Sequence, residues 1–192
     1  MKNVLVALIV AVVLGAGALY LQGGALREGA RPTVSRVVNA PEPAPVDPAP
    51  YLAAFPLTPL EAPPVTGTTR VAKALDKALV PYRRGDYVAA ASALDGVKLD
   101  HPDDPTVTLY LGIARLFIDE PANALEILQT MPPNATPEVA GEAAWYSLVG
   151  IARLRNPTDV EVRARTLCAS PLPTAPRACD AIARLSTAQT KP

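Results

Sequence analysis

Few side chains in this sequence are of the types that carry out chemistry, and their positions favour structural roles. There is a single histidine, His101, in a predicted turn, so a zinc site built from several histidines is excluded. The sequence contains neither a glycine-rich phosphate loop nor a G-x-S-x-G nucleophile elbow. Capping and the helix dipole explain four carboxylates at predicted helix starts: Asp103, Asp104, Asp119 and Glu120. We therefore predict no catalytic residues, no metal site, no cofactor and no enzymatic activity.

The two cysteines, Cys168 and Cys179, are too few for a four-thiolate metal site. They enclose about ten residues between the last two predicted helices. In an oxidising compartment they would form a disulfide that pins the terminal helix, stabilising the fold by about 3 kcal/mol. The alternative is a pair of buried free thiols.

The composition argues against a nucleic-acid partner and gives no sign of a small-molecule substrate. Lysine and arginine total 18, as do aspartate and glutamate, whereas nucleic-acid-binding domains are usually basic. The length of 192 residues suits one domain with an extension. Proline, with 22 residues, is far above its usual share of about 5%, and it is clustered, which helps to place domain boundaries.

Internal similarity is the main signal for architecture. The pentapeptide Gly-Ile-Ala-Arg-Leu occurs at 112–116 and again at 150–154. Small residues recur at steps of 34 residues, from Ala78 to Gly112 and from Ala90 to Ala124. Small residues at fixed places allow antiparallel helices to approach closely, so the pattern predicts helical hairpins laid side by side.

Periodicity and capping residues give the expected helices. Asp86 can cap one helix, Asp104 followed by Pro105 can cap the next, and Thr158 with Glu161 forms a capping box. The predicted helices are 68–84, 87–98, 105–118, 120–131, 136–155, 159–168 and 174–186.

Residues of about 70–170 resemble the tetratricopeptide repeat family, whose period is 34 residues. The resemblance rests on Gly85, Tyr87, Ala90, Pro102, Leu111, Gly112 and Ala124. Trp145 lies near the position of the family's tryptophan, one residue out of register with Gly150. The resemblance implies an all-α fold of about six to seven helices in antiparallel hairpins.

The resemblance also implies that the first helix of each hairpin lines a concave groove for a protein partner. The lining carried over by position is Leu75, Leu79, Tyr82, Arg83, Leu109, Ile113, Leu116, Phe117, Ile151 and Leu154. The alternative interpretation is that these residues form the core between hairpins.

The N-terminal segment from Val4 to Leu21 is apolar and uncharged. At about 27 Å as a helix it could cross the bilayer core, so we predict a single transmembrane anchor. The alternative is a cleavable signal peptide with a site at 16–18, but the apolar run exceeds the usual 7–15 residues or so, and Lys2 is the only basic residue before it.

A proline-rich linker follows, with nine prolines between positions 41 and 64. Such density favours extended polyproline II, which could hold a domain up to about 75 Å from the membrane. Pure spacers rarely need large apolar residues. We therefore hypothesise that one stretch docks on the partner or on the chain's own groove through Tyr51, Leu52, Phe55 and Leu57.

Positive charges after the apolar segment favour a cytoplasmic domain, but the cysteines and the long linker favour the outside. We expect an anchor at 1–21, a linker at 22–66, a helical domain at 67–188 and a tail at 189–192.

The function expected from these features is that of a scaffold or accessory subunit. The protein would be a single-pass protein of a bacterial inner membrane, contacting lipid through residues 4–21, with its helical-repeat domain in the periplasm. Through protein–protein interactions it would brace or assemble a respiratory, photosynthetic, secretion or cell-wall complex. The alternatives are a periplasmic chaperone-like adaptor that binds peptides transiently, or a secreted soluble binding protein if the N-terminus is cleaved.

Overall fold

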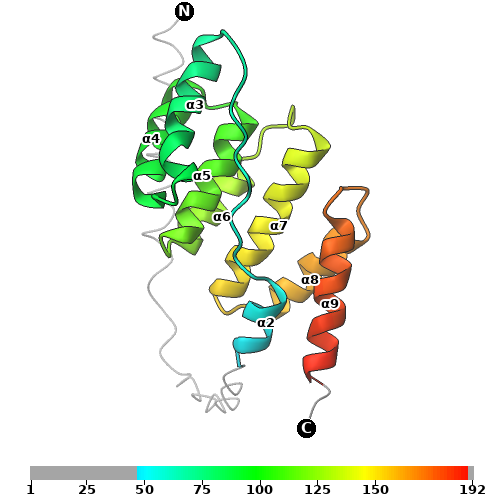
Figure 1. Ribbon diagram of the computed structural model, residues 1–192. Helices are drawn as coiled ribbons and strands as arrows, with labels where there is room; N and C mark the ends of the chain where they lie inside the picture. The colour runs from blue at the N-terminus through cyan, green and yellow to red at the C-terminus, as the bar shows by residue number, and fades with distance from the viewer. Residues whose placement is uncertain (1–46, 190–192) are drawn as a thin grey trace, which may run out of the picture. The chain divides into compact units, whose positions relative to one another are not determined.

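The computed structural model describes residues 47–189, and their regular structure is entirely α-helical (Figure 1). The all-α class expected from the sequence is therefore confirmed for this part of the chain. Its helices are α2 (Ala49–Ala54), α3 (Arg70–Arg83), α4 (Tyr87–Asp100), α5 (Pro105–Phe117), α6 (Pro121–Gln129), α7 (Pro137–Arg153), α8 (Pro157–Cys168) and α9 (Ala175–Gln189).

The helices from α3 to α8 form three consecutive hairpins, α3–α4, α5–α6 and α7–α8, laid side by side (Figure 1). Each helix packs against the next along the chain, and α5 also packs against α7. The last helix, α9, packs against α8, and the short helix α2 packs against both α9 and α7. The described part thus has a helical-repeat-like arrangement.

The three hairpin turns share a backbone conformation that recurs at nearly constant spacing. The three turns contain the three residues with positive φ in the described part: Gly85 at 78°, Asp119 at 61° and Arg155 at 56°. They are 34 and 36 residues apart (119 − 85 and 155 − 119). In each case the next residue is the N-cap of the following helix: Asp86, Glu120 or Asn156. The structural period is therefore close to, but not constant at, 34 residues.

The repeated pentapeptide does not occupy equivalent places, because its offset of 38 residues differs from the 36 residues between the second and third turns. A Cβ atom added to Gly112 would lie 2.6 Å from Leu128, on the hairpin partner α6. One added to Gly150 would lie 3.1 Å from Leu125 and 3.4 Å from Leu116, in the preceding hairpin. Identical sequences therefore pack different pairs of helices.

Most predicted helix starts are confirmed, and one is wrong. The side chains of Thr69, Asp86, Asp104 and Thr136 accept hydrogen bonds from backbone N–H groups in the first turns of α3, α4, α5 and α7. The predicted capping box at Thr158 does not begin α8. Asn156 caps that helix instead, since Pro157 fits its first turn and the Asn156 side chain accepts from the Asp159 N–H.

Within residues 47–189 no helix is long and apolar enough to cross a membrane. The predicted anchor at 4–21 and the predicted linker up to residue 46 lie outside the described residues.

The described part of the predicted linker is not an isolated spacer. Four of its residues, Tyr51, Ala54, Phe55 and Ala62, are buried in the same core as the hairpins. Residues 49–54 form α2, because proline in the first turn of a helix loses no hydrogen bond. Residues 55–65, which we call the strap, have no helix or strand and run from α2 toward the start of α3 along the hairpins (Figure 1).

Candidate functional site

The strap begins at a fully buried phenylalanine. The ring of Phe55 lies 5.6 Å, centroid to centroid, from the ring of Trp145 on α7, which is also fully buried. The guanidinium carbon of Arg177 on α9 lies 3.9 Å from the Trp145 centroid, a cation–π contact. A second arginine on α9, Arg184, donates to the Ala54 carbonyl at 3.3 Å. Aromatic packing and two cations therefore fix this end of the strap.

Beyond Phe55, two tyrosines hold the strap by its main chain. The Tyr146 hydroxyl on α7 donates to the Thr58 carbonyl at 2.7 Å, and the Tyr110 hydroxyl on α5 donates to the Glu61 carbonyl at 2.7 Å. Burial raises the pKa of Tyr146 to about 12 and also raises the pKa of Tyr110, so both hydroxyls stay protonated donors near neutral pH. Hydrogen bonds to main-chain carbonyls recognise the backbone of the strap and do not depend on its side chains.

An ion pair on α3 holds the C-terminal end of the strap. Arg83 donates through Nε to the Ala62 carbonyl at 2.9 Å and pairs with Asp76 at 2.6 Å. An oxygen of Asp76 accepts from the Val65 N–H at 3.2 Å. Hydrogen bonds from Arg83 and then from the Val65 backbone lower the pKa of Asp76, which favours the carboxylate that both contacts require.

An aromatic cluster lies under residues 59–62. The Tyr82 ring meets the rings of Tyr110 and Tyr87 edge-on, with centroids 5.1 and 5.3 Å apart, and Tyr87 stacks on Phe117 at 4.1 Å. The Tyr82 hydroxyl is buried beside the Leu60 backbone but makes no hydrogen bond of normal geometry to a described residue. Next to it is an open pocket of about 720 Å³, lined by Pro59, Leu60, Glu61, Ala62, Tyr82, Arg83, Arg84, Gly85 and Tyr87.

Three of the four residues predicted to dock are packed against the helical array. Tyr51 and Phe55 are buried, Leu57 is half-buried against the core, and Leu52 is 40% exposed. The helical conformation of α2 separates them, since positions 51 and 55 share one face of a helix and position 52 lies to the side. The Tyr51 hydroxyl also donates to Glu161 on α8 at 3.0 Å.

The residues predicted to line a groove lie in different surroundings. Six are buried core between helices: Leu75, Leu79, Leu109, Ile113, Leu116 and Ile151. Tyr82 is buried in the aromatic cluster, and Arg83 binds the strap. Phe117 is partly buried, and Leu154 is 46% exposed at the end of α7. The interpretation of these positions as core therefore describes most of them.

Tyr110 and Tyr146, which lie 36 residues apart on the first helices of two hairpins, were not among the residues predicted for the site. A signal was present, because a tyrosine in an apolar helix face must bring its hydroxyl to a partner when buried. The sequence does not show that the partner is a carbonyl of the linker.

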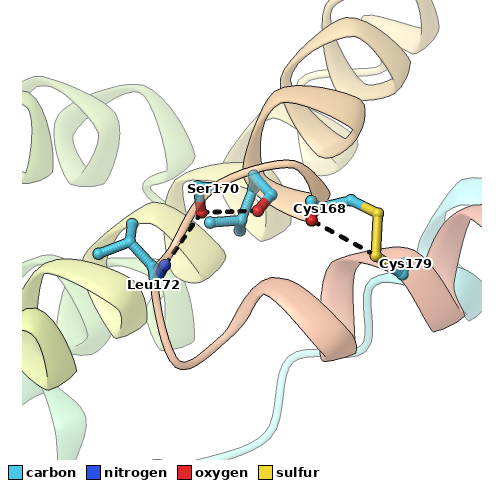
Figure 2. Close-up of a disulfide and its surroundings, with 5 residues drawn as sticks. Cys168, Ser170, Leu172 and Cys179 are labelled. Carbon is cyan, nitrogen blue, oxygen red and sulfur yellow. Dashed lines mark hydrogen bonds between the residues drawn. A yellow bond between two sulfur atoms is a disulfide. The ribbon is translucent and has the colours of Figure 1, made fainter.

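Cys168, the last residue of α8, forms a disulfide with Cys179 in α9, and no free cysteine occurs among residues 47–189 (Figure 2). The loop beside it turns on Ser170, whose hydroxyl donates to the Leu167 carbonyl at 2.7 Å and accepts from the Leu172 N–H at 3.3 Å (Figure 2). This loop also walls a pocket of about 290 Å³ between α7 and α8.

Among the residues described, no cluster of three or more histidine, cysteine, aspartate or glutamate side chains could hold a metal ion. Comparison of the chain with protein-family models, curated proteins and solved structures found no match. The resemblance to tetratricopeptide repeats therefore stays a prediction.

Proposed function

We propose that this protein is a non-catalytic interaction subunit whose tetratricopeptide-like hairpins hold a partner protein of a multisubunit membrane or envelope complex. Residues 4–21 would anchor it in a bacterial inner membrane, with the helical domain in the periplasm. The partner complex would be respiratory, photosynthetic, secretory or involved in cell-wall synthesis.

The observation that carries the proposal is that the helical array already holds an extended segment along one face. Tyr110, Tyr146 and Arg83, from three successive hairpins, each donate to a main-chain carbonyl of the strap. A row of donors spaced along a rigid scaffold is suited to a linear protein ligand. The disulfide between Cys168 and Cys179 supports placing the domain in an oxidising compartment such as the periplasm.

A second candidate is a chaperone-like adaptor that binds many peptides transiently. It is favoured by the same main-chain contacts, because hydrogen bonds to carbonyls do not depend on the ligand's side chains. A secreted soluble binding protein would follow if residues 1–21 were cleaved.

Affinity capture of the full-length protein from detergent-solubilised membranes separates these candidates. We expect the same partner, in constant stoichiometry, after a high-salt wash, and capture of this protein when the partner carries the tag. A changing set of proteins that wash off in salt would support the adaptor instead. Release of the intact protein from membranes by an alkaline wash would refute the membrane anchor.

A further inference from the structure

The strap is buried at its first residue, and the rest of it lies on the surface of the helices. Phe55 is fully buried between helices, whereas from Pro56 onward only Ala62 is buried. The side chains of Leu57, Leu60 and Val65 are half-buried against the core, and those between them are exposed, apart from Ala62. Of residues 56–65, Ala62 is therefore the one whose side chain would leave a buried position if this segment detached from the helices.

The spacing of the inward side chains matches an extended proline-rich ligand. Leu57 and Leu60 are three residues apart, which is one turn of polyproline II, and Pro56 and Pro59 favour that conformation. Beneath this stretch lie the aromatic rings of Tyr82 and Tyr110. Aromatic-lined grooves that bind polyproline II segments are a recurring mode of peptide recognition.

The strap does not use all of the hydrogen-bonding groups beneath it. The Tyr82 hydroxyl is buried beside the Leu60 backbone without a hydrogen bond of normal geometry to a described residue. This hydroxyl weakens the bound state, because a buried polar group without a well-formed hydrogen bond has lost its water. The pocket of about 720 Å³ beside residues 59–62 also leaves room next to the strap.

We infer that residues 56–65 are a displaceable occupant of this groove, and that the groove's other ligand is an extended proline-rich peptide of the partner protein with leucine-like side chains three residues apart. The inference rests on the proposed function, since it names the part of the partner that is recognised. Phe55 and α2 stay in place during the exchange and keep the freed segment close to its site.

The first test measures binding of a fluorescent peptide with the sequence of residues 56–65 to the full-length protein. The tethered strap competes at an effective concentration on the order of millimolar, so the natural protein binds the peptide weakly. The variant Leu57→Ser/Leu60→Ser weakens the strap but leaves the groove intact. We expect it to bind the peptide at least about tenfold more tightly than the natural protein does.

The matched control is Leu99→Ser/Val162→Ser, which changes two apolar side chains that are 84% and 60% exposed and lie outside the groove. It should bind the peptide as weakly as the natural protein. A peptide with both leucines replaced by serine should bind none of the three proteins. Equal binding by all three proteins, with unchanged far-ultraviolet circular dichroism, would overturn the inference.

A second measurement does not depend on the folding of a variant. Hydrogen exchange of the natural protein, with and without several millimolar peptide, reports on the Val65 N–H, which is bonded to Asp76. Displacement predicts faster exchange at Val65 when peptide is present, and unchanged exchange would overturn the inference.

The two proposals fail separately. Recovery of a stable membrane partner without any peptide binding would refute the inference that the strap is displaceable and would leave the proposed function standing. Peptide binding without a membrane partner would refute the proposed function and leave the displaceable strap standing.

Discussion

At the scale of single residues, three tyrosines near the strap differ in what their hydroxyls do. Tyr110 and Tyr146 each donate to a strap carbonyl at 2.7 Å, whereas the Tyr82 hydroxyl is buried without a hydrogen bond of normal geometry. Because the three side chains are chemically identical, removing each hydroxyl compares the contribution of its hydrogen bond to the free energy of unfolding.

Tyr110→Phe and Tyr146→Phe should each lower the free energy of unfolding by about 1 kcal/mol, since each loses one intramolecular hydrogen bond. Tyr82→Phe is the control and should be neutral or slightly stabilising, because it removes a polar group that gains nothing from burial. Urea denaturation followed by circular dichroism measures all three. A larger loss for Tyr82→Phe than for the other two would contradict the assigned contacts.

Two glycines in helices provide a second residue-scale comparison. Gly112 lies against Leu128, so the added methyl group of Gly112→Ala would overlap a side chain and should cost about 1–3 kcal/mol. Apart from its chain neighbours and the backbone of its own helix, Gly96 in α4 has no atom within 4 Å of the place that a Cβ atom would take, so Gly96→Ala should stabilise by about 0.5–1 kcal/mol through helix propensity. Opposite shifts in thermal midpoint are expected, and shifts of the same sign would contradict the packing at Gly112.

At the scale of elements, the disulfide joins the last turn of α8 to α9, and α9 carries Arg184, which donates to the last residue of α2, and Arg177, which donates to Thr58 of the strap. The bond therefore constrains the helix that closes the end of the array next to α2.

Cys168→Ser/Cys179→Ser should lower the free energy of unfolding by about 3 kcal/mol, as expected when a loop of roughly this length loses its cross-link. Denaturation with and without reductant provides the check. The natural protein should lose stability in reductant, and the double variant should not respond. An equal response of both proteins would show that reduction acts elsewhere.

At the scale of the whole molecule, the folded unit includes residues that resemble a linker. Phe55 and Tyr51 are buried against α7 and other helices, far along the chain from their own position. The stability of the hairpins should therefore depend on the segment before them.

A chain that starts at Thr66 lacks α2 and the strap and should unfold at lower urea than a chain that starts at Asp47. Loss of the Phe55 contact alone is worth on the order of 3–5 kcal/mol. Circular dichroism should show helix in both chains, because α3 to α9 are retained. Equal urea midpoints would show that residues 47–65 add nothing to the fold.

Local signals in the sequence determined most of the helices. The caps at Asp86 and Asp104 and the prolines at helix starts act within a few residues, so their effect can be predicted without knowing the rest of the fold. The error at α8 is also local, because the cap was assigned to Thr158, whereas Asn156, two residues earlier, accepts the hydrogen bond from the Asp159 N–H.

The tertiary structure alone decided the role of the proline-rich segment. Dense proline excludes ladders of hydrogen bonds but is equally compatible with a free spacer and with a docked, extended strap. The contacts that distinguish the two join Tyr110 to Glu61 and Tyr146 to Thr58, across 49 and 88 positions. Partners that far apart leave no periodicity in the sequence, and so they emerge only when the hairpins are packed side by side.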